Sequence, residues 1–220
     1  MKEIKVLLAE DHAVVRESIR EFLSKQQDII VVGEAGDGIE AVDLTNKLRP
    51  DIVVIDIAMP KLNGITATKQ IRQSLPATKV LVLSAYDYDE YVFALLEAGA
   101  AGYLLKDVTG RQLVDAIRTV HRGDSILHPS VTRKVMEQFK ERGKDLTTKP
   151  SGLLTEGEKA VLKAAAKGLT SKDIARQLHL SPRTVEARIT SIFNKLGAGS
   201  RMEAVITALK AGWLTLDDVS

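Results

Sequence analysis

The chain has 220 residues, of which 45% are hydrophobic and 27% are charged, and it contains no cysteine. This length accommodates two domains, each large enough to bury its own core. The composition is typical of a globular protein, and the lack of cysteine excludes disulfides and thiolate metal sites. No apolar run reaches the roughly 18 residues that a membrane span needs, and the first residues lack the apolar stretch of a signal peptide. We therefore expect a cytoplasmic protein.

The formal net charge of +2 hides an asymmetry between the two halves of the chain. Residues 1–124 contain 15 Lys and Arg against 19 Asp and Glu, a balance of −4. Residues 125–220 contain 16 against 10, a balance of +6. An acidic half joined to a basic half indicates different partners for each, and the basic half is a candidate for binding a polyanion. Many solvated faces carry a similar imbalance, so the charge alone does not decide.

The first 124 residues alternate short apolar runs with amphipathic stretches. The runs are rich in Val, Ile and Leu and show little alternation, which is typical of parallel strands buried on both faces. The predicted strands are 4–9, 29–34, 52–56, 79–84 and 102–105, and the predicted helices are 13–25, 38–48, 64–74, 88–98 and 110–121. Five such units predict a doubly wound α/β domain with a five-stranded parallel sheet.

The next segment, residues 125–152, changes character. Ser130–Arg142 has the pattern of a short amphipathic helix, and Gly143–Gly152 is polar with little apolar content. Such a composition is typical of a linker. The predicted domains are therefore 1–124 and 153–220, joined by this segment.

From Leu153 onward the strand pattern disappears, and residues typical of helix starts and helix ends become frequent. Capping-box spacing, in which two side chains satisfy free N–H groups reciprocally, occurs at Thr155–Glu158, Thr170–Asp173 and Ser200–Glu203. Ser181-Pro182 offers a further helix start. Helix ends are indicated by Gly168, by Gly197 or Gly199, and by Gly212. These signals predict an all-α domain of four helices, near 156–167, 171–178, 182–196 and 201–211.

Polar side chains follow four of the predicted strands at the point where each strand ends. They are Glu10-Asp11, Asp56, Ser84 and Lys106. In an open parallel sheet these ends meet at one edge, where ligands bind. Carboxylates this close repel one another unless they share a cation, and Mg²⁺ prefers such oxygen ligands. Each residue could merely cap a strand or begin a turn, but the five together favour a site.

Such a site is suited to phosphoryl transfer to an aspartate. Asp56 can attack a phosphoryl group while the metal and Lys106 neutralise its oxygens. Ser84 can donate a hydrogen bond to the acyl phosphate once it has formed.

Residues 4–121 resemble a response-regulator receiver domain, of flavodoxin-like fold. The resemblance is carried by Glu10-Asp11, by Asp56 in Asp-Ile-Ala-Met-Pro, and by Gly64, Ser84-Ala85 and Tyr103-Leu-Leu-Lys106. It implies that Asp56 accepts phosphate from a histidine kinase. It also implies that Asp11, Asp56 and the backbone carbonyl of Ala58 bind Mg²⁺, with Glu10 acting through water.

The same resemblance makes Ser84 and Tyr103 a switch pair, in which the hydroxyl moves toward the phosphate and the ring rotates inward. The alternative for Tyr103 is a half-buried strand aromatic without a switching role. The chain has Lys106-Asp107 where many receivers have Lys-Pro. This departure leaves open whether the peptide bond after Lys106 is cis.

Helix 182–196 has two faces. Val185, Ile189 and Ile192 follow helical spacing and should pack inward together with Phe193 and Leu196. The opposite face carries Arg183, Ala187, Thr190 and Asn194. A bland surface helix would look similar. However, the preceding short helix and tight turn give the order of a helix-turn-helix motif, and Ala175 is small enough to let the two helices cross closely.

A second set of motif residues is Leu154-Thr155-x-x-Glu158, Gly168, Ile174-Ala175, Leu178, Ser181, Thr184-Val185, Lys195-Leu196, Ser200-Arg201 and Ala204. By these residues, the stretch 153–214 resembles the DNA-binding domain of LuxR/NarL-type regulators. Base readout is expected from Glu186, Ala187 and Thr190 in the major groove. Phosphate contacts, which position the protein on DNA, are expected from Lys172, Ser181, Arg183, Thr184, Arg188 and Lys195.

Three positions depart from this family's pattern. Relatives often carry Lys at the position of Glu186, His at that of Arg188, and Arg at that of Gly157. The first two departures predict a different operator preference rather than a loss of binding.

The last predicted helix has an apolar stripe formed by Met202, Val205, Leu209 and Trp213. It could complete the core or form a symmetric dimer contact on DNA, and the pattern does not choose between them.

The favoured function is a DNA-binding transcription regulator of a two-component system, not an enzyme. Its expected partners are double-stranded DNA, a sensor histidine kinase and, when phosphorylated, a second copy; no membrane partner is expected. Phosphorylation of Asp56 would act through dimerisation and release of the DNA-binding domain. The enzyme alternative, an aspartyl phosphatase or phosphotransferase, usually needs a second carboxylate where this chain has Ala58. In a third alternative the receiver is only a dimer scaffold.

The four histidines are not expected to form a site, and His12 is expected to face solvent. No phosphate-binding glycine loop is present, so a nucleotide cofactor is not expected. The sequence does not identify the kinase, the operator, the sign of regulation or the receiver face that dimerises. It also leaves open whether the two domains dock.

Overall fold

The computed structural model describes residues 3–86, 88–134, 154–198, 200–211, 213–214 and 218. The chain divides into two compact units, Met1–His128 and Pro129–Ser220, which we call unit 1 and unit 2. Across the described residues, no helix is both long and apolar enough to cross a membrane.

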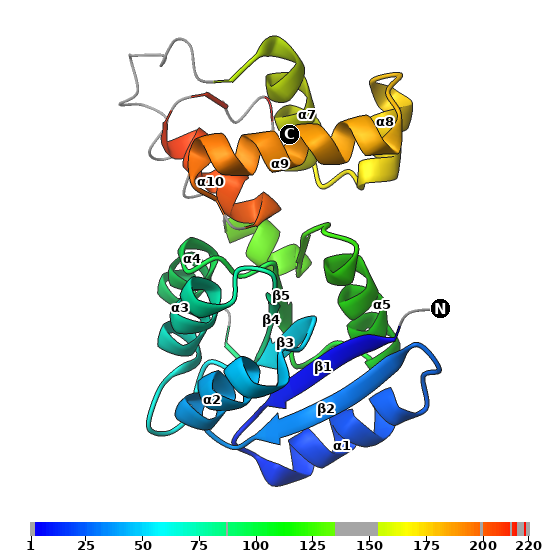
Figure 1. The fold of residues 1–220 in the computed structure, drawn as a ribbon. Helices are drawn as coiled ribbons and strands as arrows, with labels where there is room; N and C mark the ends of the chain where they lie inside the picture. Colours follow the sequence, from blue (N-terminus) through cyan, green and yellow to red (C-terminus); the bar gives the residue numbers. More distant parts are fainter. Residues whose placement is uncertain are drawn as a thin grey trace. The chain divides into compact units, whose positions relative to one another are not determined.

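Unit 1 is a doubly wound α/β fold, as predicted (Figure 1). All the strands of its sheet are parallel, in the order β2-β1-β3-β4-β5-β6. The strands are β1 (Ile4–Ala9), β2 (Ile29–Ala35), β3 (Ile52–Ile55), β4 (Lys79–Ser84), β5 (Gly102–Leu105) and β6 (Ile126–Leu127). The helices are α1 (Ala13–Ser24), α2 (Gly38–Leu48), α3 (Gly64–Ser74), α4 (Asp89–Glu97) and α5 (Gly110–His121).

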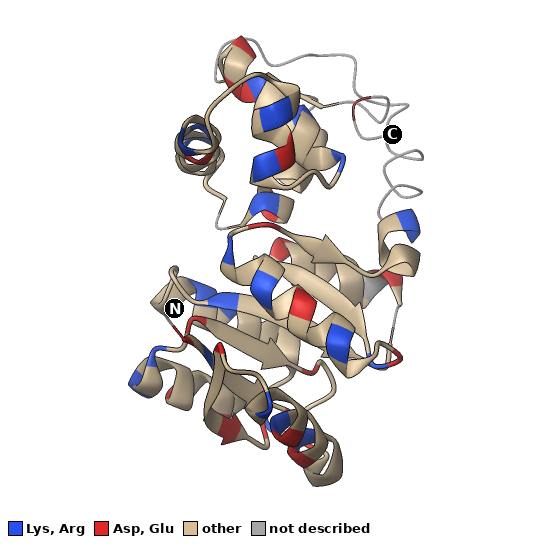
Figure 2. Cartoon of the chain, turned by 90° about the vertical axis from the view of Figure 1, so that its right-hand side faces the viewer, with Lys and Arg blue, Asp and Glu red and all other residues tan. Residues whose placement is uncertain are grey.

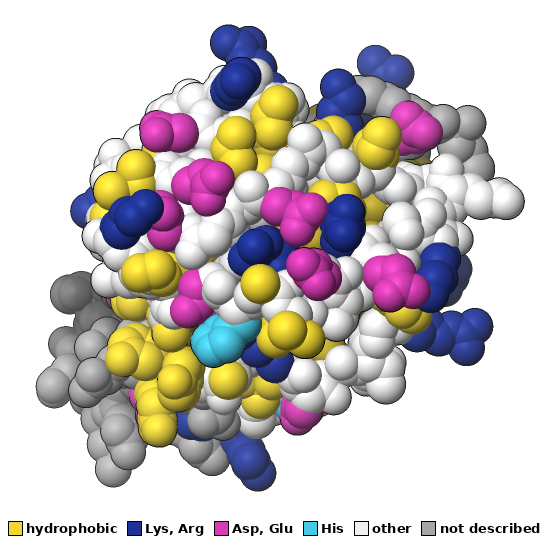
Figure 3. Space-filling view, turned by 90° about the horizontal axis from the view of Figure 1, so that it is seen from below, with side chains coloured by type: hydrophobic (Ala, Val, Ile, Leu, Met, Phe, Trp, Pro, Cys, Tyr) yellow, Lys and Arg dark blue, Asp and Glu magenta, His cyan; other side chains and the backbone are white. Residues whose placement is uncertain are grey.

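Helices cover both faces of this sheet. Helices α1 and α5 contact each other on one face, and α2, α3 and α4 form a contiguous layer on the other (Figure 1). Because helices cover both faces of the central strands, these strands are apolar with little alternation, and every residue of β3 is buried. The face seen in Figure 3 mixes acidic, basic and hydrophobic side chains.

The sheet has a sixth strand that the sequence did not reveal. Strand β6 pairs with β5 through Gly102↔Ile126 and Tyr103↔Leu127. The amide of His128 then donates to the carbonyl of Tyr103 (2.8 Å). A strand of two residues has too little pattern to be recognised, so these residues were expected in the linker. Residues 129–134 are helical, matching the start of the predicted linker helix. The rest of that helix lies outside the described residues, so the domain bounds stay a prediction.

Unit 2 is all-α and contains the four expected helices. They are α7 (Glu156–Ala166), α8 (Ser171–Gln177), α9 (Pro182–Leu196) and α10 (Arg201–Lys210). Each begins at the predicted N-cap, whose hydroxyl accepts a hydrogen bond from a backbone amide of the first turn. The reciprocal bond of a capping box forms at Thr155 and Glu158.

Two of the predicted helix ends in unit 2 fall on glycines in the left-handed region. Gly168 follows α7 with φ 75°, and Gly197 ends α9 with φ 65°. Only glycine adopts this conformation without strain, which is why the chain stops being helical there. The predicted stops at Gly199 and Gly212 lie outside the described residues.

Candidate functional site

The strand order brings the predicted site residues to one edge of the sheet. The chain reverses direction of winding between β1 and β3, and Glu10 and Asp56 directly follow these two strands. Backbone pairing continues beyond the strands, because the amide of Asp56 donates to the carbonyl of Ala9 (2.9 Å) and that of Lys106 to Ser84 (2.8 Å). The side chains therefore start from adjacent, fixed positions.

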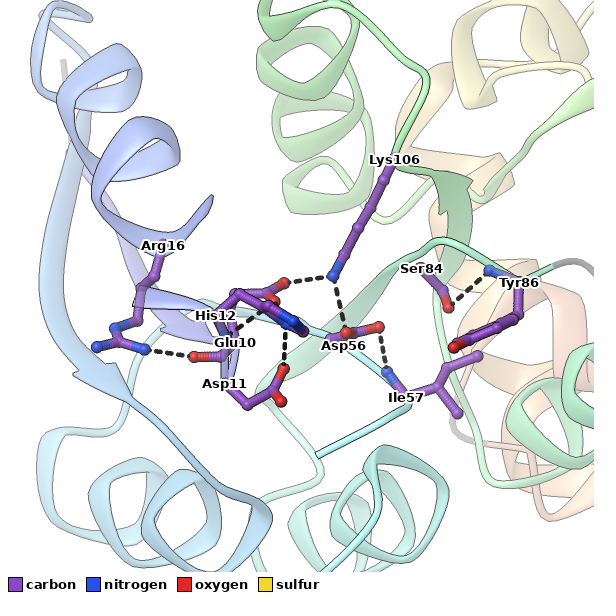
Figure 4. A network of polar contacts seen from close by, with 9 residues as sticks. All are labelled: Glu10, Asp11, His12, Arg16, Asp56, Ile57, Ser84, Tyr86 and Lys106. Atoms are coloured by element: carbon purple, nitrogen blue, oxygen red, sulfur yellow. Dashed lines mark hydrogen bonds and ion pairs between the residues drawn. The ribbon is translucent and has the colours of Figure 1, made fainter. Parts of the chain in front are cut away.

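Lys106 lies between two buried carboxylates (Figure 4). Its Nζ is 2.7 Å from Oε2 of Glu10 and 2.8 Å from Oδ2 of Asp56. Both acids are only 4% exposed. Burial lowers the pKa of Lys106, but the hydrogen bonds and charges of Asp56 and Glu10 outweigh it, so this pKa is raised. The lysine is therefore a fixed cation at the site.

The two oxygens of Asp56 have different surroundings. Oδ2 binds Lys106, and Oδ1 accepts a hydrogen bond from the amide of Ile57 (2.6 Å). The loop after Asp56 is held by Gly64, whose amide donates to the carbonyl of Ile57 (2.9 Å). A Cβ on Gly64 would lie 2.1 Å from the carbonyl oxygen of Asp56, so no other residue fits this loop without a backbone shift.

A third carboxylate, Asp11, lies beside this pair. Ligand atoms of Glu10, Asp11 and His12 lie within 4.8 Å of one another, which is close enough to hold one metal ion. The predicted set combined Glu10 and Asp11 with Asp56 and the carbonyl of Ala58, and this set stays a prediction. Three carboxylates against one lysine are a donor set of excess negative charge and hard oxygens, which fits Mg²⁺.

His12 is more involved than expected. Its side chain is 69% exposed, yet Nδ1 lies 2.9 Å from Oδ1 of Asp11 and 3.3 Å from Oε1 of Glu10. Arg16 also serves the site, since its Nη1 donates to the carbonyl of Glu10 (2.5 Å). Neither contact has a sequence signal beyond proximity along the chain.

Ser84 and Tyr103, the predicted switch pair, are both fully buried and are joined through Tyr86. The amide of Tyr86 donates to Oγ of Ser84 (3.2 Å), and the hydroxyl of Tyr103 donates to the carbonyl of Tyr86 (2.7 Å). Tyr103 is fully buried rather than half-buried, and its switching role stays a prediction. Tyr86 has no sequence signal for this role, because its backbone rather than its side chain makes the link.

The residue after Lys106 departs from the commonest receiver pattern without disturbing the site. The peptide bond between Lys106 and Asp107 is trans. Oδ1 of Asp107 lies 3.7 Å from Nε2 of His128, immediately after β6. The position of the lysine therefore does not require a cis peptide.

In unit 2, helices α8 and α9 form the predicted helix-turn-helix. Val185, Ile189 and Ile192 are buried, and Ala175 of α8 is 4% exposed in the helix crossing. Of the predicted contact residues, Thr184 and Arg188 are half-buried, and the exposed ones are Lys172, Ser181, Arg183, Glu186, Ala187, Thr190 and Lys195. Lys and Arg outnumber Asp and Glu on the described helices of this unit (Figure 2).

Lys195 has a protein partner as well as an exposed surface. Its Nζ lies 2.7 Å from Oε2 of Glu158, which also accepts from the amide and hydroxyl of Thr155. Oε1 of Glu158 accepts from Ser191 (2.7 Å). Burial raises the pKa of Glu158, but these bonds outweigh it and lower the pKa to about 2. Glu158, expected only as part of a cap, thus ties α7 to α9.

The apolar stripe of the last helix contributes to the core. Val205 and Leu209 are each 5% exposed, whereas Met202 and Trp213 are half-buried. A dimer contact by this helix stays a prediction.

The fold and the site define a receiver, with an aspartate beside a lysine at the sheet edge, in the same chain as a helix-turn-helix unit. Comparison with known families agrees. Residues 6–118 match the response regulator receiver domain, and residues 152–208 match the bacterial regulatory proteins of the luxR family. The chain belongs to the two-component response regulators of the LuxR/NarL family and is a DNA-binding transcription regulator.

Its relatives match over nearly their full length. The chain is 42% identical to the transcriptional regulatory protein YdfI of Bacillus subtilis, over 97% of this chain and 99% of that protein. It is 41% identical to the oxygen regulatory protein NreC of Staphylococcus carnosus, over 94% and 97% of the two chains.

Among solved structures, the response regulator ChrA of a heme-sensing two-component system has a TM-score of 0.53. It is 34% identical, with 97% of this chain and 100% of that chain covered. A structure of two RcsB dimers bound to two parallel DNAs has a TM-score of 0.56 at 25% identity, with 96% and 99% covered.

Proposed function

We propose that this regulator is switched by transfer of a phosphoryl group from a histidine kinase to Asp56. The observation that carries the proposal is the placement of Asp56, buried beside Lys106 with its Nζ 2.8 Å from Oδ2. An oxygen of Asp56 attacks the phosphorus, the bond from phosphorus to the kinase imidazole breaks, and an acyl phosphate forms. Lys106 neutralises charge on the transferred group.

We further propose that Glu10, Asp11, Asp56 and the carbonyl of Ala58 hold Mg²⁺ for this reaction. When bound, the ion would neutralise phosphoryl oxygens and the mutual repulsion of the carboxylates. Lys106 and His12 lie against these carboxylates and are able to compete for their oxygens. Steady enzymatic turnover is not part of the proposal, because Ala58 offers no general acid two residues beyond Asp56.

The phosphoryl group would be sensed through Ser84. If its hydroxyl turns toward the acyl phosphate, the hydrogen bond from the amide of Tyr86 is lost, and Tyr86 is also the residue that holds the hydroxyl of Tyr103. We propose that this change favours dimerisation and frees unit 2 to bind DNA. The structure of two RcsB dimers bound to two parallel DNAs supports the dimer and the DNA contact in this proposal. Because the regulator would bind chromosomal DNA, we propose a cytoplasmic location.

On DNA, the exposed side chains of α9 would enter the major groove. Glu186, Ala187 and Thr190 would meet base edges, and the phosphate contacts would come from Lys172, Ser181, Arg183, Thr184, Arg188 and Lys195.

The test of Asp56 is direct phosphorylation of the full-length chain by a small phosphodonor with Mg²⁺. The native chain should gain one acid-stable, base-labile phosphoryl group, and Asp56→Ala should gain none. Asp107→Ala, which removes an exposed carboxylate next to Lys106, is the matched control and should be phosphorylated as the native chain is. Equal incorporation by Asp56→Ala would contradict the assignment.

A further inference from the structure

Two residues from different helices lie against each other in unit 2. Gly157 is in the first turn of α7 and Arg188 is in α9, and the sequence gives no hint that they touch. In the structure, Nη1 of Arg188 donates to the carbonyl of Gly157 (3.2 Å). The two positions therefore form one contact.

This contact belongs to a row of bonds between α9 and the start of α7. Arg188, Ser191 and Lys195 are spaced at i, i+3 and i+7, so they share one face of α9. Arg188 reaches the carbonyl of Gly157, and the other two reach the carboxylate of Glu158. Arg188 lies where this face borders the exposed row that contains Ala187 and Thr190.

A side chain at position 157 would occupy the place of the Arg188 guanidinium. A Cβ there would lie 2.9 Å from Nη1 of Arg188 and 3.0 Å from its Cζ. Such distances force a shift, and the guanidinium is the part that moves because it ends a flexible side chain. Glycine inside a helix is otherwise unfavourable compared with alanine, so the residue does not serve the stability of α7.

We propose that Gly157 is a positioning residue for DNA binding, which seats the guanidinium of Arg188 on α7 so that Arg188 binds a DNA phosphate. The inference rests on the proposed role of α9 in DNA contact. A guanidinium has five N–H donors, and among the described residues only the carbonyl of Gly157 accepts one from Arg188. The remaining donors can form a paired contact with a phosphate.

The test measures binding of the full-length chain to a short mixed-sequence DNA duplex by fluorescence anisotropy over a series of salt concentrations. Both Gly157→Ala and Arg188→Ala should bind about tenfold more weakly. Each should also reduce the slope of log affinity against log salt by about 0.9, the amount for one phosphate contact. The double variant should bind no more weakly than Arg188→Ala, because both changes remove the same contact.

Two further measurements separate positioning from damage to the fold. Gly157→Ala should melt at the native temperature or above it, since alanine is the better helix former. The exchanged pair Gly157→Arg with Arg188→His should recover the native salt slope by supplying the guanidinium from α7. Lys163→Ala removes a charge of α7 that is paired with Asp218, and as the control it should change affinity less than about twofold.

Native affinity and salt slope in Gly157→Ala would overturn the inference, and so would a loss that adds to that of Arg188→Ala. If Arg183→Ala still weakens binding in either case, the proposed DNA surface stands without this inference. If Arg183→Ala and Arg188→Ala both bind as the native chain does, the proposed surface itself is wrong, and the inference falls with it.

Discussion

Each unit contains a buried carboxylate joined to a lysine at 2.7 Å, yet the two clusters differ in balance. In unit 2, Glu158 receives Lys195, Ser191 and two donors of Thr155, so both of its oxygens are occupied. In unit 1, Glu10 and Asp56 share Lys106, and Asp11 lies beside them. A saturated carboxylate holds helices together, whereas a group of carboxylates with too few cations fits the metal ion that we propose it binds for phosphorylation.

The largest effect should come from substitution of Lys106, in the cluster of unit 1 where carboxylates outnumber cations. Lys106→Met should lower the rate of phosphorylation by a small phosphodonor about 100-fold, because the cation that meets the phosphoryl oxygens is lost. The rate follows from the time course of phosphate incorporation. Lys61→Met, which removes a lysine of the loop after Asp56 that pairs with Asp37, should stay within about threefold. A native rate in Lys106→Met would contradict the role of this residue.

Substitution of Glu158 in the cluster of unit 2 should lower stability and leave phosphorylation of unit 1 unchanged. Glu158→Gln should lower the free energy of unfolding of unit 2 by about 2 to 3 kcal/mol at neutral pH, since a buried charged acceptor with several donors is lost. Urea denaturation of the full-length chain followed by helix content measures this. Arg176→Ala breaks an exposed pair with Asp173 and should cost no more than about 0.5 kcal/mol. An equal cost for both variants would show that Glu158 has no special role.

The loss of stability at low pH should show the special role of Glu158 as well. The pKa of Glu158 is lowered from 4.5 to about 2 in the folded protein. Its contribution to stability is therefore complete above pH 4.5 and is lost as the pH falls toward 2, a change on the order of 2 kcal/mol. Denaturation at a series of pH values should show this loss in the native chain and not in Glu158→Gln. Parallel pH curves for the two proteins would contradict the lowered pKa.

Loss of an uncharged, buried hydrogen bond in unit 1 should have a smaller effect on stability. Tyr103→Phe removes the hydroxyl that donates to Tyr86 and keeps the buried ring. The unfolding free energy of unit 1 should fall by about 1 kcal/mol, while phosphate incorporation at Asp56 should proceed at the native rate. A large loss of incorporation would place Tyr103 in the chemistry rather than in the response to it.

The sequence predicted the fold class and the helices of unit 2 because their signals are local. Apolar runs without alternation indicate buried parallel strands, and Thr155, Thr170, Ser181 and Ser200 each cap the helix that they were expected to begin. Strand β6 was missed because two residues carry no period. Its pairing with β5 is a tertiary event.

The residues of the candidate site could be predicted only where they lie at the end of a strand. Glu10, Asp56 and Lys106 follow strands, so parallel topology alone brings them together. Two other contacts join side chains to backbone carbonyls of distant elements. Tyr103 donates to Tyr86, and Arg188 donates to Gly157. Residue types do not encode such contacts. Glu158 shows the same limit, since its cap was visible in the sequence and its bond to Lys195 was not.

The most direct test of the central claim measures DNA affinity before and after phosphorylation on the same samples. The full-length chain and Asp56→Ala are each incubated with Mg²⁺, with or without a small phosphodonor, and then titrated with genomic fragments in a footprinting assay. The account predicts protection that strengthens only when the native chain has gained a phosphoryl group, with no change in Asp56→Ala. Unchanged protection by fully phosphorylated native protein, or an equal gain by Asp56→Ala, would contradict it.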